Sequence, residues 1–181
     1  MEPNETTSIV LRSLANGFHP GITSIIANYL EEAAGLCLEE QGHCSGVALV
    51  VKGIENNGFV LEWEPGDPKK GPCWDRYQAT ECGASGIAIL LIYHLTSWRV
   101  IERAQKGDRV DYWLGEIDDD DPPFLKKKGR LEVSGIRKGD EYRVRSRAKE
   151  KLNRLSLSSG LLPTFVVIIE FGTPMSHVEH L

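Results

Sequence analysis

Two acidic residues fall in segments that the sequence predicts to be β-strands. Successive side chains of a strand point to opposite faces of the sheet. Asp111 therefore lies opposite the apolar residues of the segment 109–114, and Glu132 lies on the polar face of the segment 130–136. If these two strands pair, the two carboxylates converge.

Two carboxylates held close together repel one another, and this costs stability unless a cation, a proton or a basic partner offsets it. Magnesium is a suitable partner because it binds a few carboxylate oxygens and keeps several waters, which leaves room for phosphate oxygens and an attacking water. We therefore expect Asp111 and Glu132 to be ligands of Mg²⁺ or Mn²⁺.

Positive charge is concentrated in one part of the chain. The net charge is −5, yet residues 126–154 contain 12 Lys and Arg against 4 Asp and Glu. Such clustering is typical of a surface that binds a polyanion, although a solvated helix face balanced by the acidic half is an alternative. Together with paired carboxylates it predicts hydrolysis of nucleic-acid phosphodiesters. The cations expected to contact nucleic acid are Arg130, Arg137, Lys138, Arg143, Arg145, Arg147 and Lys151.

The order of these features resembles the restriction-endonuclease-like, or PD-(D/E)XK, nuclease superfamily. Glu81 at the start of a helix is followed by Asp111 and Glu132 in successive strands, a basic helix and an apolar strand, over about residues 78–171. The resemblance implies a core of a helix, a mixed sheet and a second helix. It also implies that the two strand carboxylates bind magnesium and that Glu81 is the helix carboxylate that some members use for metal or water.

The chain departs from the pattern of that superfamily. Ser134 stands where the family has a lysine, two residues after the second strand carboxylate, and the proline before the first is missing. A serine cannot supply the positive charge of the lysine. Some members of the family provide that charge from the next helix, where Arg147, Lys149 and Lys151 are candidates, and we assign Lys149 to catalysis.

The elements that position these residues can be read from periodicity and turn signals. Residues 21–41 have the apolar spacing of an amphipathic helix. Residues 47–51 and 59–63 flank an Asn-Asn-Gly turn and predict a β-hairpin. A second helix, capped by Thr80, is expected over residues 81–94, with a short helix near 99–105.

The rest of the chain alternates strands with one helix. Strands are predicted at 109–114, 130–136 and 164–171, and a basic helix, or a strand leading into one, at 142–155. Loops are predicted at 65–73 and 118–123. This pattern favours an α/β (α+β) domain with a mixed β-sheet flanked by helices. The N-terminal helix and hairpin would lie beside a restriction-endonuclease-like core.

Length and composition suggest one compact domain of 181 residues, with residues 1–18 as an extended or frayed arm. The apolar run at 86–93 is much shorter than the roughly 20 residues that span a bilayer, and the start of the chain lacks a signal pattern. The four cysteines are irregularly spaced, unlike a disulfide framework. We expect reduced thiols, a cytoplasmic location and no membrane insertion.

The main hypothesis is a magnesium-dependent nuclease that acts on nucleic acid. The alternative is a non-catalytic subunit of a defence or restriction-like complex that has the same fold and binds nucleic acid or protein, and Ser134 motivates it. This alternative predicts binding that weakens with salt but needs no metal. A weaker third possibility is a small-ligand-binding module that uses the loop 65–73.

Overall fold

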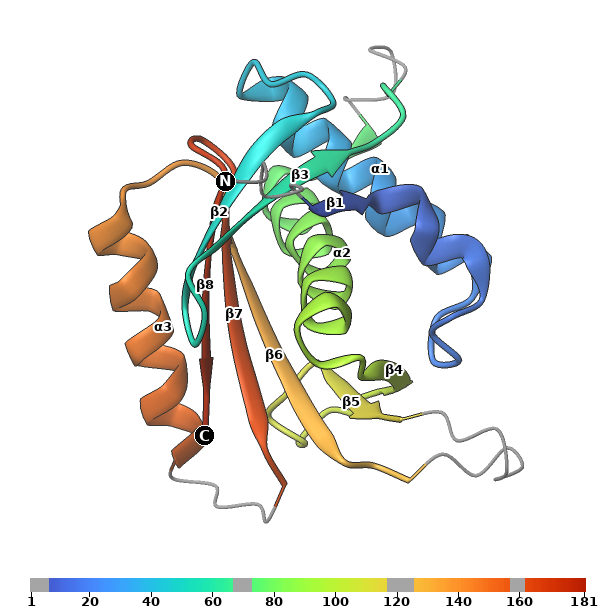
Figure 1. Ribbon diagram of the computed structural model, residues 1–181, viewed down its shortest axis with the longest axis vertical. Helices are drawn as coiled ribbons and strands as arrows, with labels where there is room; N and C mark the ends of the chain where they lie inside the picture. The colour runs from blue at the N-terminus through green and yellow to red at the C-terminus, as the bar shows by residue number, and fades with distance from the viewer. Residues whose placement is uncertain (1–6, 67–72, 117–125, 157–161) are drawn as a thin grey trace, which may run out of the picture.

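The computed structural model describes residues 7–66, 73–116, 126–156 and 162–181. In these residues an eight-stranded mixed sheet has the strand order β1-β3-β2-β8-β7-β6-β5-β4 (Figure 1). The strands are β1 (Thr7–Val10), β2 (Val47–Gly53), β3 (Asn57–Glu62), β4 (Arg99–Arg103), β5 (Tyr112–Gly115), β6 (Gly129–Ile136), β7 (Thr164–Glu170) and β8 (Met175–His180). The helices are the 3₁₀ helix η1 (Leu11–Asn16), α1 (Ser24–Glu40), α2 (Arg76–Thr96) and α3 (Glu141–Ser156).

Helices cover both faces of the sheet. Figure 1 shows α1 and α2 on one side and α3 on the other. The central strand β7 supplies side chains to both cores: Phe165 and Val167 pack with the helices α1 and α2, whereas Val166 and Ile168 pack with α3. This explains why the segment is apolar without alternation, because a strand covered on both faces needs apolar residues at every position. The α/β (α+β) class and the mixed sheet are confirmed.

Helix α2 runs through the centre of the fold. Asp75 caps its start by accepting a hydrogen bond from the Gln78 amide at 2.9 Å. The expected start at residue 81 with Thr80 as the cap is therefore wrong, since the Thr80 hydroxyl donates to the Arg76 carbonyl inside the helix. Gly83 lets α1 approach closely, because a Cβ there would lie 2.8 Å from the Ala34 Cα.

By length and composition, α2 alone among the described helices could cross a membrane. However, 61% of its most apolar stretch is buried inside the fold. Its apolar side chains pack against α1 and the sheet, which is the environment of the core helix of a soluble domain.

Other predicted elements are also in place. The first helix, the β2–β3 hairpin, β6, the basic helix α3 and β7 agree with the expected segments to within a few residues. The predicted loop 118–123 and most of the loop 65–73 lie outside the described residues. The four cysteines are free thiols.

Two predicted segments are wrong. Residues 99–103 form the strand β4, which pairs antiparallel with β5, and not a short helix. The N-terminal arm is part of the fold from residue 7 onward: β1 pairs with β3, and Ile9, Leu11 and Leu14 are buried in the main core. The polar residues of this segment hid the few apolar ones that anchor it. The last strand, β8, was not predicted.

Candidate functional site

The candidate site lies where β5 ends its pairing with β6. The two strands are paired only over Tyr112–Leu114 and Gly129–Leu131. Beyond this point the amide of Val133 donates to Asp111 Oδ2 at 2.8 Å, and the amide of Gly135 donates to Glu81 Oε2 at 3.4 Å. Two carboxylates therefore occupy the open edge of β6, where a neighbouring strand would otherwise lie.

Asp111 precedes β5, although it was predicted within a strand that begins at residue 109. That start is wrong because Arg109 has φ 61°, a left-handed conformation that a strand does not accommodate. The Asp111 amide donates to the Leu131 carbonyl at 2.9 Å, which holds the residue against β6. The expected pairing of the two strands is confirmed, and it brings Asp111 beside Glu132.

Two cations of α3 reach the polar residues of β6. Lys151 Nζ lies 2.5 Å from Glu132 Oε1, and Arg147 Nη1 donates to Ser134 Oγ at 3.0 Å. Glu132 and Ser134 are both buried, so these contacts are shielded from water. A positive charge from the next helix is thus present beside the position where Ser134 replaces a lysine.

The carboxylates share one electrostatic environment. Burial raises the pKa of Glu132, and the neighbouring charge of Asp111 raises it further, while Lys151 lowers it. Burial also raises the pKa of Glu81, against the hydrogen bond from the Gly135 amide and the charge of Lys151, which lower it. The charge of Asp111 also raises the pKa of Glu81, so Asp111 acts on a carboxylate of α2 and on one of β6.

The fit of a metal to this site depends on two carboxylates. In the part of the chain that the structure describes, no group of three or more His, Cys, Asp or Glu side chains is arranged to hold a metal ion. Magnesium needs fewer protein ligands than this, because it is commonly held by one or two carboxylates together with waters and substrate phosphates. Asp111 and Glu132 supply such a pair, and the pKa of Glu132 stays raised by burial and by Asp111 even though Lys151 is bound to it, so a further cation would favour its charged form.

Two pockets flank the carboxylates. The smaller, of about 250 Å³, places Glu132 among Arg109, Lys151 and Arg154. The larger, of about 360 Å³, places Glu81 beside Tyr77 and a group of guanidinium groups. Those arginines are Arg76, Arg137, Arg143 and Arg147. Cations therefore line both sides of the carboxylates.

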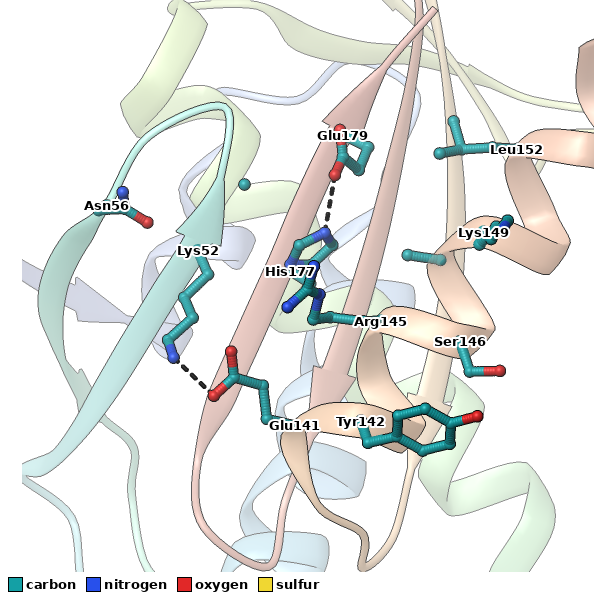
Figure 2. A pocket seen from close by; sticks show the side chains of 12 residues that line it. Lys52, Asn56, Glu141, Tyr142, Arg145, Ser146, Lys149, Leu152, His177 and Glu179 are labelled. Carbon is teal, nitrogen blue, oxygen red and sulfur yellow. Dashed lines mark hydrogen bonds and ion pairs between the residues drawn. The ribbon is translucent and has the colours of Figure 1, made fainter.

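Helix α3 carries its cations on two sides. Residues of an α-helix advance by about 100° each, so residues four apart share a side and residues two apart nearly oppose one another. Arg147 and Lys151 belong to the side that faces Glu132. Lys149 lies on the other side and lines a groove of about 1150 Å³ together with Arg145 (Figure 2). The assignment of Lys149 to the carboxylate site is therefore wrong, and Lys151 occupies that place.

The groove beside Lys149 is separate from the carboxylates. It lies between α3 and the β2–β3 hairpin, over β8, and Figure 2 shows one ion pair and one hydrogen bond in it. Lys52 Nζ lies 2.7 Å from Glu141 Oε2, and His177 Nε2 lies 2.8 Å from Glu179 Oε1. Arg145, which was predicted to contact nucleic acid, lines this groove and neither of the two pockets beside the carboxylates.

The remaining predicted cations differ in their surroundings. Arg137 is engaged within the fold: it pairs with Glu40, and its Nη1 donates to Cys37 Sγ at 3.2 Å. Arg130 Nη2 donates to the Leu162 carbonyl at 3.4 Å. Arg143 and Lys138 are exposed, and Arg143 donates to the Lys138 carbonyl at 3.2 Å. Of these four residues, Arg137 and Arg143 line the pocket beside Glu81.

Several residues that line the two pockets were not predicted as site residues, among them Arg76, Tyr77, Arg109 and Arg154. Arg154 could have been found, because it lies three residues after Lys151 and so shares its side of the helix. Arg109 and Tyr77 could not, since Arg109 was placed in a strand and α2 begins before its predicted start.

Comparison with family models, curated proteins and solved structures gives no match.

Proposed function

We propose that this protein is a metal-dependent nuclease whose reaction takes place at the open edge of β6. One observation carries the proposal: Glu81, Asp111 and Glu132 converge there from three elements, with Lys151 bound to Glu132. Carboxylates with raised pKa values, grouped with specific charged partners and flanked by pockets, are characteristic of functional sites.

Asp111 and Glu132 would hold Mg²⁺ or Mn²⁺, which when bound polarises a phosphate and lowers the pKa of a bound water. Asp111 is positioned by two backbone contacts, through its own amide and through the amide of Val133. Glu132 is held by the bond with Lys151. The protein therefore orients both carboxylates before substrate arrives, which reduces the cost of reorganisation during the reaction.

Lys151 would supply the positive charge that is missing because Ser134 stands where the superfamily has a lysine. Its ammonium group lies between Glu132 and the pocket that contains Arg109 and Arg154. In that position it can donate a hydrogen bond to a phosphate oxygen or to the attacking water. Arg147, held by the Ser134 hydroxyl, adds a second positive charge on the same side of α3.

The substrate backbone would follow α3. Arg143, Arg147, Lys151 and Arg154 occur at intervals of four, four and three residues and therefore form a row along one side of the helix. At a rise of 1.5 Å per residue, this row extends over about 16 Å. A row of that length can contact several phosphates, which fits a polyanionic substrate and not a small ester.

The chain order supports the likeness to the PD-(D/E)XK superfamily. Helix α2, the strands β4, β5 and β6, helix α3 and strand β7 follow one another, with β6 and β7 parallel. A helix, an acidic residue directly before β5, another within β6, a basic helix and an apolar strand thus follow the order on which the resemblance rests. We include the restriction-endonuclease-like core in the proposal, together with a cytoplasmic location that fits the four free thiols.

The test is a cleavage assay on single-stranded DNA, duplex DNA and RNA, with magnesium, manganese or a chelator. We expect cleavage that requires metal and is lost in Asp111→Asn and Glu132→Gln. Asp111→Asn keeps an oxygen that can accept from the Val133 amide, so the fold is retained while the charge is removed. Glu141→Gln, in the groove across α3, is the control and should cleave normally. Equal activity of all variants would refute the proposal.

The second candidate is a non-catalytic binding subunit, in a defence or restriction-like complex, that uses the same basic row. It is favoured by the observation that each carboxylate already has a structural partner: the amides of Val133 and Gly135, and Lys151. On this account the carboxylates stabilise the open edge of β6. Nucleic-acid binding that weakens with salt, is indifferent to metal and leads to no cleavage of any substrate would favour it.

A further inference from the structure

The pocket beside Glu81 contains an exposed aromatic ring, whereas none lines the pocket beside Glu132. Tyr77, in the first turn of α2, is 75% exposed. It lines the same pocket as Arg147, although the two residues come from helices on opposite faces of the sheet. A flat ring that is left open to solvent beside a candidate catalytic carboxylate offers a face to which another ring can bind.

The same pocket has more positive than negative charge. The side chain of Arg76 is 84% exposed, and its Nη2 lies 3.9 Å from Glu40 Oε2. An ion pair that is this long and this exposed to solvent contributes little to stability. Arg143 is held near the pocket by its bond to the Lys138 carbonyl, and Arg147 by its bond to Ser134. The lining of the pocket contains these three guanidinium groups and one carboxylate, that of Glu81. The pocket therefore suits an anion.

We propose that this pocket is a subsite for one unpaired nucleotide next to the phosphate that is cleaved, an inference that rests on the proposed function. Tyr77 stacks on the base, and Arg76 and Arg143 bind its phosphate. The volume of about 360 Å³ lies in the lower range of ligand pockets, as a single nucleotide requires. The substrate class that follows is single-stranded nucleic acid, because a base inside a duplex has both faces covered by its neighbours.

Stacking also has a consequence for the reaction. A base held by Tyr77 fixes the sugar-phosphate backbone beside Glu81, and the next phosphate then lies toward Asp111 and Glu132. Tyr77 is therefore a positioning residue, and the protein should have little sequence preference, since every base has a face that can stack.

The experiment measures binding of a fluorescently labelled short single strand by anisotropy, with chelator present so that no cleavage occurs. The same strand as a duplex and a strand of equal length without bases are the comparison ligands. We expect Tyr77→Ala to weaken binding of the single strand by about 5- to 150-fold, and Tyr77→Phe to bind as the wild type does. Binding of the baseless strand and of the duplex should not change in either variant.

Tyr142→Ala is the matched control, because Tyr142 is also exposed but lines the groove on the other side of α3. Equal binding by Tyr77→Ala and Tyr142→Ala would overturn the subsite, as would tighter binding of the duplex than of the single strand by the wild type. The readout does not depend on cleavage. If Tyr77→Ala loses binding of the single strand while the wild type cleaves no substrate, the subsite stands and the nuclease proposal is refuted. If the wild type cleaves but Tyr77→Ala binds the single strand as tightly as the wild type does, the subsite alone is refuted.

Discussion

Individual carboxylates at the β6 edge are held at a cost to the fold. Burial raises the pKa of both Glu81 and Glu132, so the charged form of each is less favourable in the folded chain than in the unfolded one. Lys151 offsets part of this cost for Glu132. Residues that reduce stability where they stand are commonly retained for function, and this supports a role for the charge itself.

Neutralising Glu81 should stabilise the protein while removing function. Because its pKa is raised on folding, the folded chain binds more protons than the unfolded chain just above the ordinary carboxyl pKa, and stability falls as pH rises through the raised value. Glu81→Gln should therefore have a higher Tm than the wild type at pH 7, and the difference should shrink below pH 4.5, the ordinary value. Thermal unfolding across pH measures this. A lower Tm for the variant at pH 7 would contradict it.

At the scale of elements, the orientation of α3 determined which of its predicted cations lie beside Glu132. Spacing along α3 predicted a basic helix but could not show which side would meet the sheet. Three buried residues, Val144, Ala148 and Leu155, set that orientation through packing with β7, and it turned Lys149 away from Glu132. The sequence can show which cations of α3 reach Glu132 only if the buried face of the helix is identified first.

The convergence of Asp111 and Glu132 was predictable because it needed only strand alternation and one pairing between neighbouring strands. The contribution of Glu81 to the β6 edge was not, since it depends on how α2 crosses the sheet. That crossing relies on a close approach of Gly135 to the Thr80 carbonyl. The edge strand β4 was misread and the interior strand β8 was missed because their polar and charged sequences resemble exposed segments, whereas sheet pairing stabilises both.

The two sides of α3 should differ in function. Lys151→Ala removes the cation bound to Glu132 and should reduce cleavage by about 10²-fold, the scale seen when a group that stabilises a transition state is removed. Lys149→Ala removes the same charge from the same helix on the groove side and should cleave within about twofold of the wild type. Initial rates at saturating substrate compare the two. Equal reductions in rate would show that the helix contributes only overall charge.

The contact between α2 and β6 should be intolerant of added volume. At Gly135 a Cβ would lie 2.4 Å from the Thr80 carbonyl oxygen, so Gly135→Ala must push the helix from the strand. We expect the free energy of unfolding, measured with urea, to fall by about 1–3 kcal/mol. Gly58→Ala, where nothing lies within 4 Å, is the control and should be near neutral. A tolerated Gly135→Ala would show that this spacing is not fixed.

At the scale of the whole molecule, the chain combines a net charge of −5 with a basic row on one side of α3. The acidic remainder opposes non-specific attachment to polyanions, so binding should be confined to this row and its two pockets. The apolar helix α2 forms the core beneath this site.

Salt dependence should identify the row as the binding surface. Removing one cation that binds a phosphate lowers the slope of log affinity against log salt concentration by about 0.7 for a single strand. Arg154→Ala, next to Glu132 in its pocket, should lower the slope by this amount, whereas Arg145→Ala, in the groove, should leave it unchanged. Anisotropy titrations at several salt concentrations provide the slopes. An equal change for both variants would place nucleic acid across the whole helix.

Binding of a divalent metal by the carboxylates of the β6 edge tests the central claim most directly. Titration of Mn²⁺ into the protein, followed by calorimetry, should show binding in the wild type and in Glu141→Gln. Binding should be abolished or strongly weakened in Asp111→Asn and Glu132→Gln. If Asp111→Asn binds the metal as tightly as the wild type, the carboxylates serve only to satisfy the open edge of β6, and the catalytic account is wrong.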